Sequence, residues 1–189
     1  MRLDDYQREA LRTATPITDF TVGPHLSCAA LGLSEECAEL LGVIDGDASA
    51  AEKEAGDVLW YLALLAGCLN LRLSELCHCE ELDTLTFGPI LTDEDEVRWR
   101  LLLMTRAAEV AGAVKKAVHH RAGIPNHLGT MRSAALDVFE IIAALADNQP
   151  SAWNLNSAAA RNVDKLRARY PDGWSARAAA ARADERGPA

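Results

Sequence analysis

Residues 32–68 read GLSEECAELLGVIDGDASAAEKEAGDVLWYLALLAGC, and this stretch decides the fold. Apolar residues recur there at helical spacing on both sides of Asp45-Gly46-Asp47, which breaks the pattern. Helices joined by so short a break pack antiparallel. The stretch therefore predicts a helical hairpin, with helices at about residues 25–44 and 49–71.

Each helix of this predicted hairpin carries two acids three residues apart: Glu36 and Glu39 in the first, Glu54 and Asp57 in the second. Residues so spaced share a helix face. At about 100° per residue, both pairs fall in line with apolar residues, so packing of the apolar stripe draws the acids inward. A solvent-exposed acidic face is the commoner arrangement, but it does not explain this alignment. Four converging carboxylates need a cation, and oxygen ligands favour Mg²⁺ or Mn²⁺.

The remaining sequence shows almost no strand signal and predicts more helices. We expect an all-α fold with a four-helix-bundle-like core of antiparallel hairpins and extra helices. Ser49 with Glu52, and Thr92 with Asp95, have the spacing of capping boxes at helix starts. The helices beyond the hairpin are expected at residues 3–13, 93–120, 127–147 and 152–170.

Residues 93–147 predict a second hairpin that resembles the first. Residues 105–112 can be laid on 32–39, and residues 134–139 on 54–59. In this alignment Glu109 and Asp137 match Glu36 and Asp57, whereas Gly112 and Ala134 replace Glu39 and Glu54. True duplication would give the chain one full acid set and one half set. Chance alignment of Ala-rich helices is the alternative.

Length and composition limit the domain count and the class of partner. The chain has 189 residues, of which 49% are hydrophobic. We expect residues 1–174 to form one domain, residues 83–92 to be a linker within it, and residues 175–189 to be a flexible tail. The net charge of −9 argues against nucleic-acid binding through a general basic surface.

The cellular setting is predicted from cysteine usage and hydropathy. The five cysteines are odd in number, and three sit in apolar helical stretches, which favours reduced thiols in a cytoplasm. No basic-then-apolar leader opens the chain. The most apolar run, residues 58–69, is shorter than the roughly 20 residues that cross a bilayer, so no membrane partner is expected.

Residues 32–39 and 53–62 together resemble the MazG-like, all-α nucleoside triphosphate pyrophosphohydrolases, whose signature is EExxE followed by ExxD. Residues 6–14 and 162–173 also look similar to stretches of that family. The resemblance covers about residues 4–71 and 156–174. The sequence between them is much longer than the simplest members carry, as if a second hairpin had been inserted.

This resemblance implies Mg²⁺-dependent hydrolysis of a nucleoside triphosphate, such as a dNTP or a non-standard NTP, to the monophosphate and pyrophosphate. By motif position, Glu36, Glu39, Glu54 and Asp57 would bind two or three Mg²⁺ ions, with Mn²⁺ as a substitute. Glu35 would bind a further metal or act as the base that orients the attacking water. Family members are typically dimers, so we expect a homodimer or a pseudo-dimer within one chain.

Candidate phosphate ligands lie on two helices. Lys165 and Arg169 are four residues apart on one helix face and match the C-terminal motif of the family, although routine surface charge would look the same. Lys53 is a further candidate, and for this residue an ion pair with a nearby acid is the favoured alternative.

Four residues are candidates for a nucleobase subsite. Tyr61, Trp60, Asn70 and His25 are candidates for stacking or hydrogen bonding, and Asn70 looks like the Asn near the end of this helix in the family. Trp60 and Tyr61 are more often core residues in such a helix.

Two other functions stay open at this point: a phosphoribosyl-ATP pyrophosphohydrolase activity, and a non-catalytic helical module that senses nucleotide or binds a partner.

Overall fold

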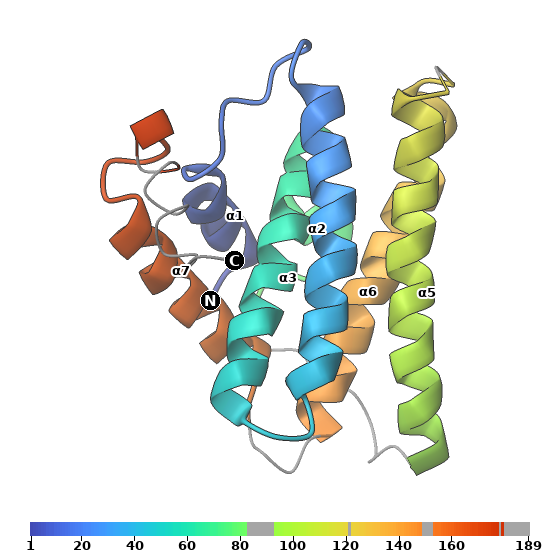
Figure 1. Ribbon diagram of the computed structural model, residues 1–189, viewed down its shortest axis with the longest axis vertical. Helices are drawn as coiled ribbons and strands as arrows, with labels where there is room; N and C mark the ends of the chain where they lie inside the picture. The colour runs from blue at the N-terminus through green and yellow to red at the C-terminus, as the bar shows by residue number, and fades with distance from the viewer. Residues whose placement is uncertain (83–92, 121, 149–152, 178, 180–189) are drawn as a thin grey trace, which may run out of the picture.

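The computed structural model describes residues 1–82, 93–120, 122–148, 153–177 and 179, and the regular secondary structure of this part of the chain is helical. Four long helices form the core (Figure 1): α2 (Val22–Val43), α3 (Ala48–Cys68), α5 (Asp93–Val118) and α6 (Leu128–Asn148). Helix α2 packs on α3, α5 packs on α6, and α2 joins the two hairpins by packing on α5. The predicted all-α bundle of antiparallel hairpins is confirmed.

The extra helices gather around α3. Helices α1 (Leu3–Leu11) and α7 (Leu155–Arg169) both pack on α3, on the side away from α5 in Figure 1. The short α4 (Leu73–Cys77) contacts α1 and α6, and η2 (Ile124–Asn126) lies between α5 and α6. Helix α3 is therefore the central helix of the first hairpin, covered by α2 on one side and by α1 and α7 on the other.

Two helix starts differ from the sequence expectation. Helix α2 begins at Val22, because Pro24 fits in a first turn whose N–H groups need no helical partner. The predicted capping box of Ser49 and Glu52 is wrong: Asp47 caps α3 by accepting a 2.9 Å bond from the Ser49 backbone N–H. The side chain of Glu52 instead accepts from Arg161 of α7 at 2.7 Å, since α7 lies alongside.

Helix α3 also ends earlier than predicted. It stops at Cys68, and Asn70 follows with φ of 55°, a left-handed conformation that Asn tolerates better than most residues. Helix α7 starts at an Asn154 cap, whose side chain accepts a 2.8 Å bond from the Ser157 backbone N–H.

Some predictions fall outside the described residues. The Thr92–Asp95 cap and the linker at residues 83–92 do so, as does most of the predicted tail at 175–189. No described helix combines the length and the apolar character needed to cross a membrane.

Candidate metal centre and adjoining cavity

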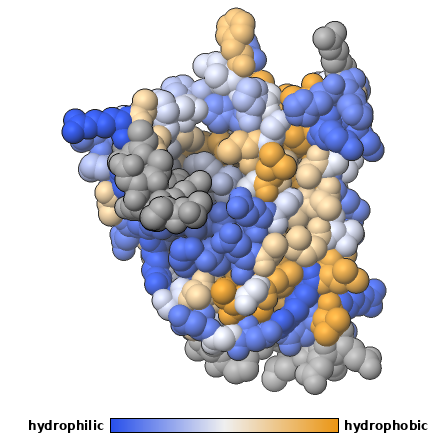
Figure 2. All heavy atoms as spheres, in the orientation of Figure 1, coloured by the Kyte–Doolittle hydropathy of each residue, from blue (hydrophilic) through white to orange (hydrophobic). Residues whose placement is uncertain are grey.

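Three of the four predicted metal ligands meet between α2 and α3. Glu36, Glu54 and Asp57 each offer a carboxylate oxygen, and these oxygens lie within 4.8 Å of one another. Glu54 is only 7% exposed, and the other two are partly buried. Hydrophilic side chains gather over the middle of α2 and α3 on the face shown in Figure 2. The core-facing arrangement predicted for these three acids is therefore the observed one.

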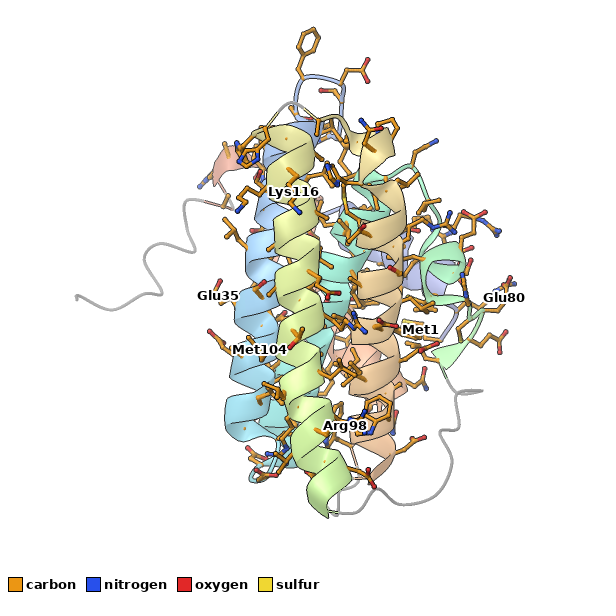
Figure 3. The ribbon with its side chains drawn as sticks, turned by 90° about the vertical axis from the view of Figure 1, so that its right-hand side faces the viewer. Met1, Glu35, Glu80, Arg98, Met104 and Lys116 are labelled. Atoms are coloured by element: carbon orange, nitrogen blue, oxygen red, sulfur yellow. The ribbon has the colours of Figure 1, made fainter. Side chains whose placement is uncertain are left out.

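Glu39 and Glu35 lie at the edge of this group. Both side chains are exposed, and Glu35 projects outward from α2 in Figure 3. Burial, followed by the charges of Asp57, Glu39, Glu54 and Glu35, raises the pKa of Glu36 to about 7. The five acids therefore act as one electrostatic unit centred on Glu36, even though Glu39 lies outside the close trio.

One buried carboxylate oxygen of the trio has no hydrogen-bond partner among the described residues. Glu54 Oε1 accepts a 2.7 Å bond from Lys53, whereas Oε2 is buried with no hydrogen-bond partner among the described residues. Leaving a buried acceptor unsatisfied costs about 1–3 kcal/mol. An all-oxygen donor set with an unused buried oxygen fits a hard divalent cation such as Mg²⁺. Lys53 takes the role of ion-pair partner, the alternative favoured for it in the sequence.

Helix α7 holds the third acid of the trio. Asp57 Oδ1 accepts a 2.8 Å bond from Asn162 and a second bond from Lys165. Close approach of α7 needs Gly56, because a Cβ there would lie 2.9 Å from the backbone oxygen of Ala158. The sequence motif placed Lys165 near phosphates, and the structure places it beside the acids that would hold the phosphate-bound ions.

A cavity of about 440 Å³ opens beside the acids. Glu36 and Asp57 line one part of it, and Lys165 and Arg169 add two cations to its wall. Its volume lies in the range of small-molecule sites. Two of the predicted acids and two of the predicted phosphate ligands thus border one space.

Aromatic side chains form another part of the cavity wall. Trp60 and Tyr61 pack edge to face with ring centroids 4.9 Å apart, and Trp60 Nε1 donates to Thr13 Oγ1 at 3.1 Å. Tyr61 packs against Gly32 of α2, where a Cβ would come within 2.1 Å of its ring. Both rings therefore stand partly in the core and partly in the cavity.

The other two nucleobase candidates differ in position. His25 lines the cavity; its Nδ1 lies 2.7 Å from the Thr21 carbonyl oxygen, and its Nε2 lies 2.7 Å from Thr15 Oγ1. A carbonyl only accepts, so Nδ1 carries the proton and Nε2 accepts from the hydroxyl in the neutral ring. Asn70 is exposed beyond the end of α3 and is not part of the cavity lining. Its left-handed backbone gives it a role in ending the helix.

Two residues at the site were not singled out from the sequence. Asn162 contacts Asp57 directly, and Tyr6 contacts Asn162 with a 2.9 Å hydrogen bond. Both fall in stretches that resemble the family, which was the only signal for them. No local spacing connects α1 and α7 to the acids of α3.

The counterparts in the second hairpin form a different cluster. Glu109 Oε2 lies 2.7 Å from a terminal nitrogen of Arg106, and Asp137 Oδ2 lies 2.9 Å from its Nε. Both acids thus pair with one arginine, and each of the three side chains is about one-third to two-fifths exposed.

A scan against protein-family models and searches of curated proteins and of solved structures each found no match to this chain. The likeness to the MazG-like enzymes therefore stays a prediction that its sequence motifs carry.

Proposed function

We propose that this chain hydrolyses a nucleoside triphosphate to the nucleoside monophosphate and pyrophosphate with the help of Mg²⁺. One observation carries the proposal: Glu36 and Asp57 line a cavity that also presents two cations and aromatic rings. Beside them lies Glu54, whose buried Oε2 has no hydrogen-bond partner among the described residues. A nucleotide offers phosphates for the cations and a flat base for the rings.

Each group has a role in this reaction. Glu36, Glu54 and Asp57 would hold two or three Mg²⁺ ions, with Glu39 at the edge of the set and Mn²⁺ as a substitute. When bound, these ions offset the phosphate charge and lower the pKa of water. Glu35 would accept the proton of the attacking water, whose oxygen bonds to the α-phosphorus as the bond to the bridging oxygen breaks.

The remaining residues would bind the substrate and its leaving group. Lys165 and Arg169 would contact phosphate oxygens and stabilise the departing pyrophosphate. Tyr61 and Trp60 would contact the base from the cavity wall. The packing of α5 on α2 within one chain supports a pseudo-dimer, and the free state of all five cysteines supports a reducing cytoplasm.

A substrate panel at millimolar Mg²⁺ with pyrophosphate detection tests the proposal. The panel contains ordinary dNTPs, dUTP, non-standard NTPs and phosphoribosyl-ATP. Loss of groups that merely orient metal ligands costs about 10–100-fold in activity, so Glu54→Gln should reduce pyrophosphate release at least about 100-fold. The matched control is Glu109→Gln in the second hairpin, which should stay within about twofold of the wild type.

The panel also separates the other candidate functions. Turnover of phosphoribosyl-ATP alone would assign the chain to that reaction. Nucleotide binding without any pyrophosphate release would identify a non-catalytic sensing module. Release that EDTA does not inhibit, or that survives Glu54→Gln, would overturn the metal-dependent mechanism.

A further inference from the structure

A chain of hydrogen bonds, buried at its start and partly buried at its end, runs from α1 through α7 to the acid trio. The hydroxyl of Tyr6 lies 2.9 Å from Asn162 Oδ1, and Asn162 Nδ2 donates to Asp57 Oδ1 at 2.8 Å. Tyr6 is fully buried and Asn162 is 3% exposed. Three helices that are distant in the sequence therefore meet at one carboxylate.

The polarity of this chain follows from the chemistry of its groups. An ionised Asp57 only accepts hydrogen bonds, so the amide of Asn162 must turn its Nδ2 toward it. The amide oxygen then faces Tyr6, whose hydroxyl must donate. A flipped amide would set two acceptor oxygens 2.8 Å apart. Burial and the charge of Asp57 raise the pKa of Tyr6 well above its ordinary value, so the hydroxyl keeps its proton.

The two donors to Asp57 reach the same oxygen. Asn162 and Lys165 both donate to Oδ1, so they restrain rotation of the carboxylate without using Oδ2. The close fit of α7 makes this possible, since a Cβ on Gly56 would lie 2.9 Å from the Cβ of Asn162. The hydroxyl of Tyr6 also lies 3.1 Å from the Gly56 carbonyl oxygen, which ties α1 to the same turn of α3.

We propose that Tyr6 and Asn162 are positioning residues that orient the Asp57 carboxylate toward the divalent ion. This role rests on the metal centre of the proposed function and adds two residues to it that do not touch the ion. Hydrogen-bond partners of metal ligands fix ligand orientation, and their loss weakens metal binding. The hydroxyl of Tyr6 acts on the Asp57 carboxylate through Asn162 and through the backbone of Gly56, which precedes Asp57.

The test measures Mn²⁺ affinity by calorimetry and electron paramagnetic resonance, with no nucleotide present. Tyr6→Phe removes one hydroxyl and keeps the ring, and it should weaken Mn²⁺ binding about tenfold. Asn162→Ala removes the direct bond to Asp57 and should weaken binding at least as much. In an Asp57→Ala background, Tyr6→Phe should change the affinity by less than about twofold, because the carboxylate that it orients is gone.

Gln7→Met is the matched control for structural damage. Gln7 is the neighbour of Tyr6 and is 8% exposed; it bonds the Leu71 carbonyl at 3.1 Å and the Leu73 N–H at 2.8 Å. Its loss should lower the thermal stability measured in EDTA and leave Mn²⁺ affinity within about twofold of the wild type. A purely structural role for Tyr6 predicts the same outcome for Tyr6→Phe.

The outcomes separate the two proposals. Equal Mn²⁺ affinity in the wild type and Tyr6→Phe, or an equal loss in the Asp57→Ala background, overturns the positioning role and leaves the metal centre standing. Absence of Mn²⁺ binding by the wild type overturns the metal centre and, with it, the role of both residues.

Discussion

The two hairpins of the bundle have the same helical architecture, but their acidic side chains have different partners. In the α2–α3 hairpin, Glu36, Glu54 and Asp57 converge, and Glu54 Oε2 has no partner among the described residues. In the α5–α6 hairpin, which faces the viewer in Figure 3, Glu109 and Asp137 share one arginine. In the α5–α6 hairpin an arginine side chain pairs with both carboxylates. In the α2–α3 hairpin the buried Glu54 Oε2 is still able to accept a cation.

Two aligned positions and the packing of α7 account for this difference. Arg106 stands where the first hairpin has Leu33, and the fully buried Leu33 adds no charge. Ala134 is 1% exposed and stands where Glu54 supplies the unpartnered oxygen. Helix α7 packs on α3 of the first hairpin, where Gly56 admits it. The proposed metal centre would thus depend on a missing cation and an added buried acid, rather than on the hairpin fold itself.

Rebuilding the acid set in the second hairpin has the largest expected effect. The triple variant Arg106→Leu, Gly112→Glu and Ala134→Glu copies the first hairpin by alignment. Without metal, its uncompensated buried charge should lower the free energy of unfolding by about 3–5 kcal/mol. Mn²⁺ should restore part of that stability, and the number of Mn²⁺ ions bound per chain should exceed that of the wild type, as measured by calorimetry.

The control for this variant adds Asp137→Asn, which removes one of the four rebuilt ligands. This addition should return the Mn²⁺ stoichiometry to that of the wild type. A triple variant that binds no extra Mn²⁺ would show that the second hairpin does not share the backbone spacing of the first.

The second-largest expected effect is the pH dependence of Mg²⁺ affinity. Burial and neighbouring acids raise the pKa of Glu36 from 4.5 to about 7. The folded, metal-free chain therefore keeps a proton that the unfolded chain loses, so its free energy of unfolding falls as pH rises from 4.5 to about 7. Mg²⁺ displaces that proton, so affinity should rise with pH, by up to about tenfold per pH unit below pH 7.

Calorimetric titrations with Mg²⁺ across this pH range measure the slope. Glu36→Gln should flatten it, whereas Glu109→Gln in the second hairpin should leave it unchanged. An affinity that is independent of pH in the wild type would show that ion binding releases no proton from Glu36.

Helical periodicity explains which of these features the sequence could predict. Helix faces follow from residue spacing, so the hairpins and the convergence of Glu36, Glu54 and Asp57 could be predicted from the sequence. Glu39 is exposed outside the trio, although it has the same spacing from Glu36 that Asp57 has from Glu54, so spacing alone did not separate the two pairs. The contact between Tyr6 and Asn162 spans 156 positions, and no local pattern encodes it. The resemblance between the hairpins as a true repeat stays a prediction.

Arg106→Met has the smallest expected effect and tests how the second hairpin balances its acids. Met keeps the aliphatic stem and removes the charge that Glu109 and Asp137 share. All three side chains are partly exposed, and such ion pairs contribute about 0.2–1 kcal/mol each, so the free energy of unfolding in urea should fall by no more than about 1–2 kcal/mol. The variant should gain no Mn²⁺ site, because Ala134 still offers no carboxylate. A new Mn²⁺ site in this single variant would mean that two acids suffice, and that the arginine alone separates the hairpins.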